Sequence, residues 1–202
     1  MKSNSLFINT ATKSLQFAVL SSSSFKSIDL GSSKKALENS FVGIEKLLSD
    51  ENIKFSDIDS FYTLLGPGSN TGIRLGLTIV RTVYGLNSKI SMHGINTLKV
   101  LLTDKKGISL LSDRASNLFV GYYKNEEFVT EKVLKDDVNS NKLFKDKTLY
   151  IDKADESSIE IFKEYSNKVL IDVIKNMVDK KDEFENYSKR IDEYLPIYQF
   201  DI

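Results

Sequence analysis

The first thirty residues alternate between short apolar runs and polar breaks. The apolar runs are Leu6–Ile8, Leu15–Val19 and Phe25–Leu30, and serines at 21–24 separate the last two. Runs of this length with turn residues between them are typical of antiparallel strands. The pattern predicts a meander of three strands at the start of the chain.

A helical period follows the meander. Four apolar residues are spaced by four, three and four positions: Leu37, Phe41, Ile44 and Leu48. This spacing places them on one face of a helix. Ser32 or Ser33 can cap the helix, and we expect it to end near Asp50.

A buried strand at Ile58–Leu65 and a second helix at Ser69–Tyr84 come next. The helix carries two apolar stripes, one of Ile73, Leu77, Val80 and Tyr84 and the other of Gly72, Gly76, Ile79 and Val83. A surface helix needs only one stripe, so two suggest burial against two neighbours. Each glycine weakens the helix by about 1 kcal/mol relative to alanine, which close packing of a neighbouring backbone would offset.

The rest of the chain predicts a further α/β part. In order we expect a short apolar run at Lys89–Met92, a helix at Asn96–Thr103, strands at Ile108–Leu111, Leu118–Tyr123, Phe128–Leu134 and Thr148–Ile151, and helices at Ser157–Tyr165 and Val169–Asp179. No Pro- or Ser-rich linker separates the two parts, which we place at 1–95 and 96–202.

Composition restricts the possible chemistry. Lys and Arg (28) balance Asp and Glu (28), which argues against a protein that binds nucleic acid by itself. Cysteine is absent, and His93 is the only histidine, without an H-E-x-x-H or G-x-S-x-G motif. We therefore assign no catalytic and no metal-binding residue, and expect His93 to be a core or solvent residue. With no signal-peptide core or membrane span in the sequence, we expect a cytoplasmic protein.

The segment GPGSNTGIRLG at 66–76 joins the predicted strand to the second helix. Turns of this kind often bind phosphate at the start of a helix. This one has no Gly-Lys-Ser/Thr ending and no G-x-G-x-x-G spacing. A phosphate site at Ser69, Asn70 and Thr71 stays possible, but a tight turn before a closely packed helix is the favoured interpretation.

This segment and the β-β-β-α-β-α order together resemble the TsaB (YeaZ) family, the partner subunit of the bacterial machinery for the tRNA base threonylcarbamoyladenosine. GPGSNTGIRLGL is similar to the signature GPGSFTGLRIGL, with Asn70 in place of Phe and matches at Gly66, Pro67, Gly68, Ser69, Thr71, Gly72, Arg74 and Gly76. Weaker similarities follow in chain order. Residues 6–12 resemble I-D-T-A-T, with Asn9 in place of Asp, and residues 94–98 resemble G-V-S-T/S-L. Residues 112–119 resemble D-A-R-x-x-x-V-Y, with Ser112 in place of Asp and with Arg114 and Phe119 where the family has Arg and Tyr, and residues 196–200 resemble P-x-Y-L-R, with Gln199 and Phe200 replacing Leu and Arg.

The resemblance implies an actin-like/Hsp70-like fold of two related α/β halves, the second one reduced. In that superfamily, glycine-rich loops of both halves hold ATP, and an acidic residue of the first strand serves the metal. Asn9 cannot supply that charge to Mg²⁺. No glycine follows Gly121 to allow close backbone approach in a second loop. We expect no ATP bound in this manner and no cofactor.

The resemblance further implies a noncatalytic scaffold that activates TsaD, which transfers a threonylcarbamoyl group to adenosine 37 of tRNA, with the ATPase TsaE as a third member. In the family, the first two helices pack against the same helices of TsaD, or of a second TsaB. The expected interface residues are Leu37, Phe41, Ile44, Leu48, Gly72, Arg74, Gly76, Ile79 and Val83. Contact with tRNA is expected only through TsaD, and none with a membrane.

Two alternatives from other classes remain. The first is an ATP-binding enzyme of the actin-like superfamily, a kinase or carbamoyltransferase, which an ATP titration would distinguish. The second is a glycopeptidase-like hydrolase, which a peptide-cleavage assay would test. The departures at Asn9, Asn70, Ser112 and Phe200 leave the choice of partner open.

Overall fold

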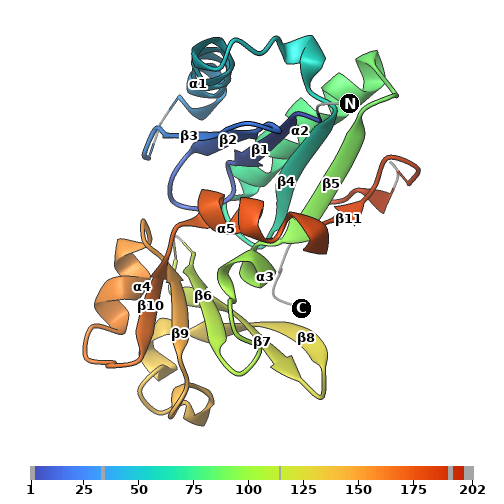
Figure 1. Ribbon diagram of the computed structural model, residues 1–202. Helices are drawn as coiled ribbons and strands as arrows, with labels where there is room; N and C mark the ends of the chain where they lie inside the picture. Colours follow the sequence, from blue (N-terminus) through green and yellow to red (C-terminus); the bar gives the residue numbers. More distant parts are fainter. Residues whose placement is uncertain (1–2, 33–34, 114, 191–192, 198–202) are drawn as a thin grey trace.

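The computed structural model describes residues 3–32, 35–113, 115–190 and 193–197. Two sheets lie one above the other in Figure 1. The upper sheet has the strand order β11-β5-β4-β1-β2-β3, and the lower sheet has the order β10-β9-β6-β7-β8. The predicted α/β class with two halves is confirmed.

The first half begins with the predicted meander and continues as expected. Its elements are β1 (Ser5–Asn9), β2 (Gln16–Leu20), β3 (Phe25–Asp29), α1 (Ala36–Asp50), a 3₁₀ turn (Phe55–Asp57), β4 (Ser60–Gly66), α2 (Asn70–Leu86) and β5 (Ser91–Asn96). β1 pairs antiparallel with β2 and parallel with β4, and β4 pairs parallel with β5. Strand β1 is therefore at the centre of the sheet.

Helices α1 and α2 cover the same face of this sheet. A Cβ on Gly43 of α1 would lie 3.5 Å from the Phe17 ring, and one on Gly76 of α2 would lie 3.9 Å from Ile8. Phe17 and Ile8 are cross-strand partners, so their side chains share one face. Figure 1 shows α5 in front of the sheet and α2 behind it.

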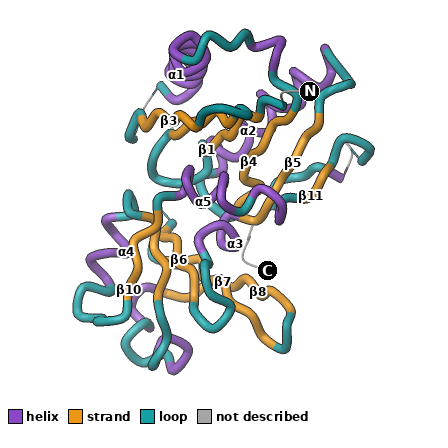
Figure 2. Tube along the Cα trace, in the orientation of Figure 1, coloured by secondary structure: helices purple, strands orange, loops and turns teal. Residues whose placement is uncertain are grey.

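The second half contains the lower sheet. Its elements are α3 (Thr97–Leu101), β6 (Ile108–Ser112), β7 (Asn117–Lys124), β8 (Glu127–Leu134), 3₁₀ turns (Lys135–Asp137 and Lys142–Phe144), β9 (Leu149–Asp152), α4 (Glu156–Ile161) and β10 (Lys168–Ile171). Then α5 (Val173–Asp179), a 3₁₀ turn (Lys181–Glu183) and β11 (Glu185–Asn186) follow. Figure 2 shows that short helices and long loops surround this sheet.

The helix predicted at Val169–Asp179 is wrong in its first part. Residues 168–171 form β10, which pairs parallel with β9, and α5 begins only after Asp172. The Asp172 side chain accepts a hydrogen bond from the Lys175 amide and caps α5. In this segment the apolar run forms a strand, and the helix begins after the N-cap aspartate that follows the run.

The end of the described chain returns to the sheet of the first half. The predicted division into 1–95 and 96–202 does not include this return. β11 pairs antiparallel with β5. The Tyr194 side chain is fully buried there. The backbone carbonyl of Tyr194 accepts a hydrogen bond from the Arg81 side chain, and the Ile197 amide donates one to the Leu65 carbonyl (2.6 Å). Residues 185–190 and 193–197 therefore contact both α2 and β5.

The rings of His93, Tyr62 and Phe7 form a stack across three adjacent strands. Ring centroids are 4.4 Å apart between His93 and Tyr62, and 4.4 Å between Tyr62 and Phe7. Burial lowers the pKa of His93 below its ordinary value. His93 is half-buried in this stack, and its assignment as a noncatalytic residue stays a prediction.

Acid should therefore destabilise the protein through His93. The unfolded chain binds the proton more tightly than the folded protein, so the contribution of His93 is complete above about pH 6.5 and is lost as the pH falls through and below this value. His93→Phe keeps a ring on Tyr62 and cannot be protonated. We expect the melting temperature of the variant to fall less between pH 7 and pH 5 than that of the wild type, measured by circular dichroism. Equal falls in the two proteins would contradict this.

Candidate functional site: the cleft between the halves

A cleft of about 1120 Å³ lies between the two halves. The first half lines it with the β1–β2 turn at residues 10–15 and with the glycine turn and the start of α2 at residues 67–75. The second half contributes Leu111, Ser112, Asp113, Phe119 and Lys132. The cleft therefore includes most of the glycine signature.

The glycine turn packs α2 against the β1–β2 turn. A Cβ on Gly72 would lie 1.7 Å from the Thr10 carbonyl oxygen, and one on Gly68 would lie 2.3 Å from the Ala11 carbonyl oxygen. Ser69 caps α2, since its hydroxyl accepts a hydrogen bond from the Gly72 amide (3.2 Å), while its own amide donates to Ala11 (2.8 Å). The signature thus allows a close approach within the chain itself.

The glycine stripe of α2 consequently faces this protein's own sheet. A Cβ on Gly76 would lie 2.6 Å from the Thr63 hydroxyl and 2.9 Å from the Thr10 hydroxyl. Gly72, Gly76 and Ile79 are buried in the isolated chain. The placement of these residues at a partner interface stays a prediction, because an apolar stripe indicates burial without indicating everything that covers it. Val83 is partly buried, and Arg74 is exposed.

The predicted stripe of α1 is divided between two faces. Ile44 and Leu48 are buried in the core, whereas Leu37 and Phe41 are 54% and 57% exposed. The buried face of α1 is instead completed by Ser40, Gly43 and Leu47. The helix starts after Lys35 and not after Ser32, while Ser33 lies outside the described residues.

Asn9 is used within the β1–β2 turn. Its side chain is fully buried. The side-chain nitrogen of Asn9 donates hydrogen bonds to the Thr12 hydroxyl and to the Gln16 side-chain carbonyl (2.9 Å each). The side-chain oxygen of Asn9 accepts a hydrogen bond from the Thr12 backbone amide (3.3 Å). The polar atoms at this position therefore hold the turn and not a ligand.

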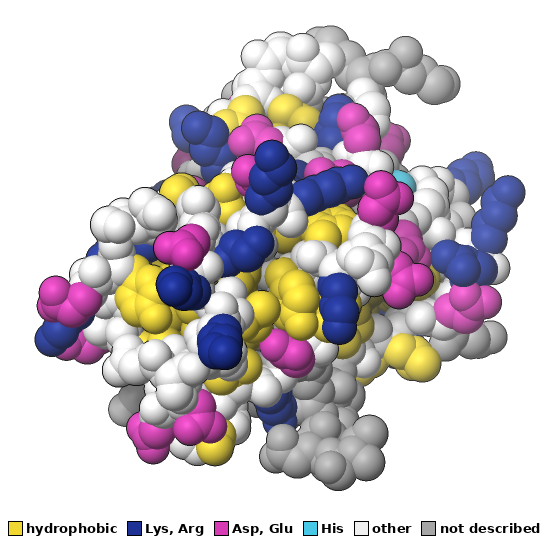
Figure 3. Space-filling view, turned by 90° about the horizontal axis from the view of Figure 1, so that it is seen from below, with side chains coloured by type: hydrophobic (Ala, Val, Ile, Leu, Met, Phe, Trp, Pro, Cys, Tyr) yellow, Lys and Arg dark blue, Asp and Glu magenta, His cyan; other side chains and the backbone are white. Residues whose placement is uncertain are grey.

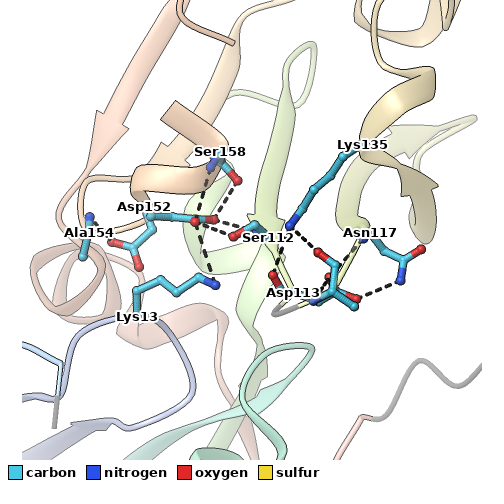
Figure 4. Close-up of polar contacts among 10 residues, drawn as sticks. Lys13, Ser112, Asp113, Asn117, Lys135, Asp152, Ala154 and Ser158 are labelled. Atoms are coloured by element: carbon cyan, nitrogen blue, oxygen red, sulfur yellow. Dashed lines mark hydrogen bonds and ion pairs between the residues drawn. The ribbon is translucent and has the colours of Figure 1, made fainter. Parts of the chain in front are cut away.

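The β6–β7 turn binds its own aspartate in the same way (Figure 4). Asp113 accepts hydrogen bonds from the amides of Ala115 (2.8 Å) and Asn117 (3.0 Å) and from the Asn117 side chain (2.8 Å). Lys135 donates to the carbonyls of Asp113 and Ala115. Arg114 and Tyr198, which carry part of the family resemblance, lie outside the described residues, as do Gln199 and Phe200, which depart from it.

A second aspartate, Asp155, follows β9 and is fully buried. The Asp155 carboxylate accepts hydrogen bonds from the backbone amide (2.6 Å) and the hydroxyl of Ser112. It also accepts hydrogen bonds from the backbone amide (3.4 Å) and the hydroxyl of Ser158. The ammonium of Lys13, on the β1–β2 turn, lies 4.0 Å away. This group of residues is not predicted from the sequence, although Asp155 and Ser158 have the spacing of a capped helix start.

Asp152 lies beside it and is 1% exposed. One of its oxygens accepts a hydrogen bond from the Ala154 amide (3.0 Å). Burial raises the pKa of Asp152, and the charge of Asp155 adds to this, although hydrogen bonds from Ala154, Thr12 and Lys13 act in the opposite direction. Among the described residues no group of three His, Asp or Glu side chains could hold a metal ion.

The family follows from a comparison with known proteins. A family model described as TsaD, tRNA N6-adenosine threonylcarbamoyltransferase, matches residues 31–187. This is well over half of the chain, and the chain belongs to this family. Within it, the chain is TsaB/YeaZ-like, as its glycine signature predicted.

Solved structures show the same fold. YeaZ from Pseudomonas aeruginosa is similar with a TM-score of 0.69 at 13% identity, covering 98% of this chain and 100% of that one. A second structure, of an uncharacterised protein with similarity to peptidase YeaZ from the same organism, has a TM-score of 0.72 at 13% identity, covering 97% and 99%. The actin-like fold of two α/β halves that the resemblance implied is therefore confirmed.

Two curated relatives have no assigned activity in their names. The uncharacterised protein MG208 of Mycoplasma genitalium is 27% identical over 121 residues, and its homologue in Mycoplasma pneumoniae is 26% identical over the same length. The matched region is 58% of this chain, and it spans 62% of each relative. In the described part of the chain, no helix has the length and apolar character needed to cross a membrane.

Proposed function

We propose that the protein is a noncatalytic partner subunit in the synthesis of threonylcarbamoyladenosine at adenosine 37 of tRNA, and that it acts by pairing with TsaD. One observation carries the proposal. Polar groups at the end of β1 and just after β6 and β9 make hydrogen bonds within the chain, whereas the resemblance implies that ATP-binding relatives use an acidic residue of their first strand for the metal. Asn9, Asp113 and Asp155 are all occupied in this way.

The pairing surface is placed on the outer side of α1 and α2. Leu37, Phe41 and Val42 of α1 are 54%, 57% and 65% exposed. Exposed apolar side chains gathered on one helix favour an interaction surface. Arg74 lies on the exposed side of α2, which covers the same sheet face. TsaE would join the resulting complex, and a homodimer through the same surface is the alternative for the protein alone.

Contact with tRNA is assigned to TsaD. The net charge of the chain is zero. On the face that Figure 3 shows, Lys and Arg side chains lie among Asp and Glu side chains. A mixed surface of this kind lacks the clustered cations that hold a phosphate backbone.

The first test is to mix the protein with TsaD from the same organism and to measure mass by size-exclusion chromatography with light scattering. We expect a one-to-one complex, and threonylcarbamoyladenosine formation when tRNA, ATP, threonine, bicarbonate and TsaE are added. Two separate peaks under all of these conditions would contradict the proposal.

Two controls separate the alternative functions. Calorimetric titration of the isolated protein with ATP and Mg²⁺ should show no binding; saturable binding together with phosphoryl or carbamoyl transfer in the absence of TsaD would favour the enzyme. Incubation with glycopeptides should give no cleavage, and cleavage would favour the hydrolase.

A further inference from the structure

We propose that strand β10 mediates self-association, and that it pairs antiparallel with β10 of a second copy of this chain about a two-fold axis at Val169. The two lower sheets would then join into one continuous sheet. β10 is an edge strand of the lower sheet and lies away from α1 (Figure 1). The proposal is therefore independent of pairing with TsaD and differs from a homodimer through α1.

The outer edge of β10 presents backbone groups that the sheet does not use. The carbonyls of Asn167 and Ile171 accept hydrogen bonds from amides of β9 and the turn after it (2.8 and 3.0 Å). Successive residues of a strand direct their N–H and C=O groups to opposite sides. The backbone groups of Lys168 and Leu170 therefore point away from β9, and no described strand pairs with β10 on that side.

β10 lacks the usual protection of an edge strand. Natural edge strands carry charges, proline or bulges that discourage pairing with other chains. The opposite edge strand, β8, carries Glu127, Glu131 and Lys132. In β10, by contrast, Val169 and Leu170 are 41% and 51% exposed. Because neighbouring residues of a strand point to opposite faces, both faces of this edge expose an aliphatic side chain.

Lys168 is the single charged residue of β10, and its side chain is bound to its own chain. The ammonium donates hydrogen bonds to the carbonyls of Phe162 (3.2 Å), Lys163 (2.6 Å) and Tyr165 (3.2 Å). These contacts hold the charge over the segment that follows α4. The lysine consequently gives the strand edge little protection against pairing.

The backbone selects one register for a second copy. With Val169 opposite its own equivalent, Lys168 of each copy lies opposite Leu170 of the other, and each such pair exchanges two hydrogen bonds. A register centred on Lys168 would place like charges opposite each other. A register centred on Leu170 would need the Asp172 carbonyl, which already accepts from the Asn176 amide of α5 (3.0 Å). This self-complementarity favours a second copy over an unrelated partner.

Cysteine cross-linking tests the register directly, because the chain contains no cysteine. Opposite residues that do not exchange hydrogen bonds have Cα atoms about 4.5 Å apart, within the reach of a disulfide. Val169→Cys should therefore form a covalent dimer on mild oxidation, measured by non-reducing gel electrophoresis. Leu170→Cys is the matched control. Its equivalents are diagonal neighbours about 7–8 Å apart, so it should cross-link at least about 10-fold more slowly.

Sedimentation velocity measures the association without a covalent bond. The interface is smaller than that of a stable dimer, so the wild type should sediment faster as its concentration rises from about 10 µM to about 1 mM. Val169→Lys places like charges opposite each other and should weaken the association at least about 10-fold. Leu134→Lys is the control, because Leu134 is 50% exposed on β8. This variant should associate as the wild type does.

Three results would overturn the proposal: a Val169→Cys variant that stays monomeric on oxidation, equal cross-linking rates of Val169→Cys and Leu170→Cys, or a wild type that stays monomeric at about 1 mM. A dimer that Phe41→Glu abolishes and Val169→Lys leaves intact would place self-association on α1 and would also overturn it. Circular dichroism checks that each variant is folded. Should Val169→Lys not fold, the two cysteine variants decide.

Discussion

Gly72→Ala should lower the free energy of unfolding by about 3 kcal/mol or more, the largest effect that we expect from a single methyl group in this protein. The added Cβ would lie 1.7 Å from the oxygen and 2.7 Å from the carbon of the Thr10 carbonyl. Both atoms belong to the backbone and cannot rotate away. Helix α2 or the β1–β2 turn must move, which would also break the 2.6 Å hydrogen bond from the Thr10 hydroxyl to the Gly72 carbonyl.

Gly85→Ala is the matched control, because it makes the same change in the same helix. Nothing lies within 4 Å of a Cβ at this position. We expect this variant to be more stable than the wild type by about 0.5–1 kcal/mol, since alanine restricts the unfolded chain and favours the helix. Urea unfolding followed by circular dichroism measures both variants. Similar unfolding midpoints in the two would show that Gly72 is not under the proposed constraint.

Phe41→Glu should weaken association with TsaD at least about 100-fold, because a charge would be buried at the centre of the proposed surface. The Phe41 side chain is 57% exposed in the isolated protein. The melting temperature of the variant should therefore stay close to that of the wild type. Surface plasmon resonance with immobilised TsaD measures the affinity.

Leu170→Glu provides the comparison for this prediction. Leu170 is 51% exposed and lies on β10 of the lower sheet, away from α1 (Figure 1). This variant should bind TsaD as the wild type does. The reverse result, with Phe41→Glu binding normally and Leu170→Glu failing, would move the partner surface to the second half.

Local patterns were sufficient for most elements of the fold. The meander, α1, β4, α2 and the strands of the second half appear close to their predicted positions, because their periods and turn residues are local properties of the sequence. Residues 168–171 were assigned to the wrong element, since a short apolar run next to a helix has no distinguishing period. Pairing with β9 makes this run a strand, and this long-range contact cannot be predicted from the local sequence.

The site was harder to predict than the fold, because burial depends on tertiary neighbours. Gly43 allows α1 to approach the Leu30 side chain, where an added Cβ would lie 2.7 Å away, whereas Phe41 on the same helix is 57% exposed. Asp155 looked like one acidic residue among many. Its role depends on Ser112, which lies 43 positions earlier in the chain. The family signature marks a turn that the structure contains, and its glycines on α2 pack against the chain's own β1–β2 turn and sheet.

The return of residues 185–197 to the upper sheet has a consequence for synthesis on the ribosome. The side chains of Arg81 and Tyr84 on α2 donate hydrogen bonds to the carbonyls of Tyr194 and Ser188, and β5 gains its outer neighbour only from β11. While the second half is still being translated, the emerging first half carries an open strand edge and unfilled space beside α2. Native packing of this half therefore begins at the N-terminus but is completed only after the C-terminal segment has left the exit tunnel.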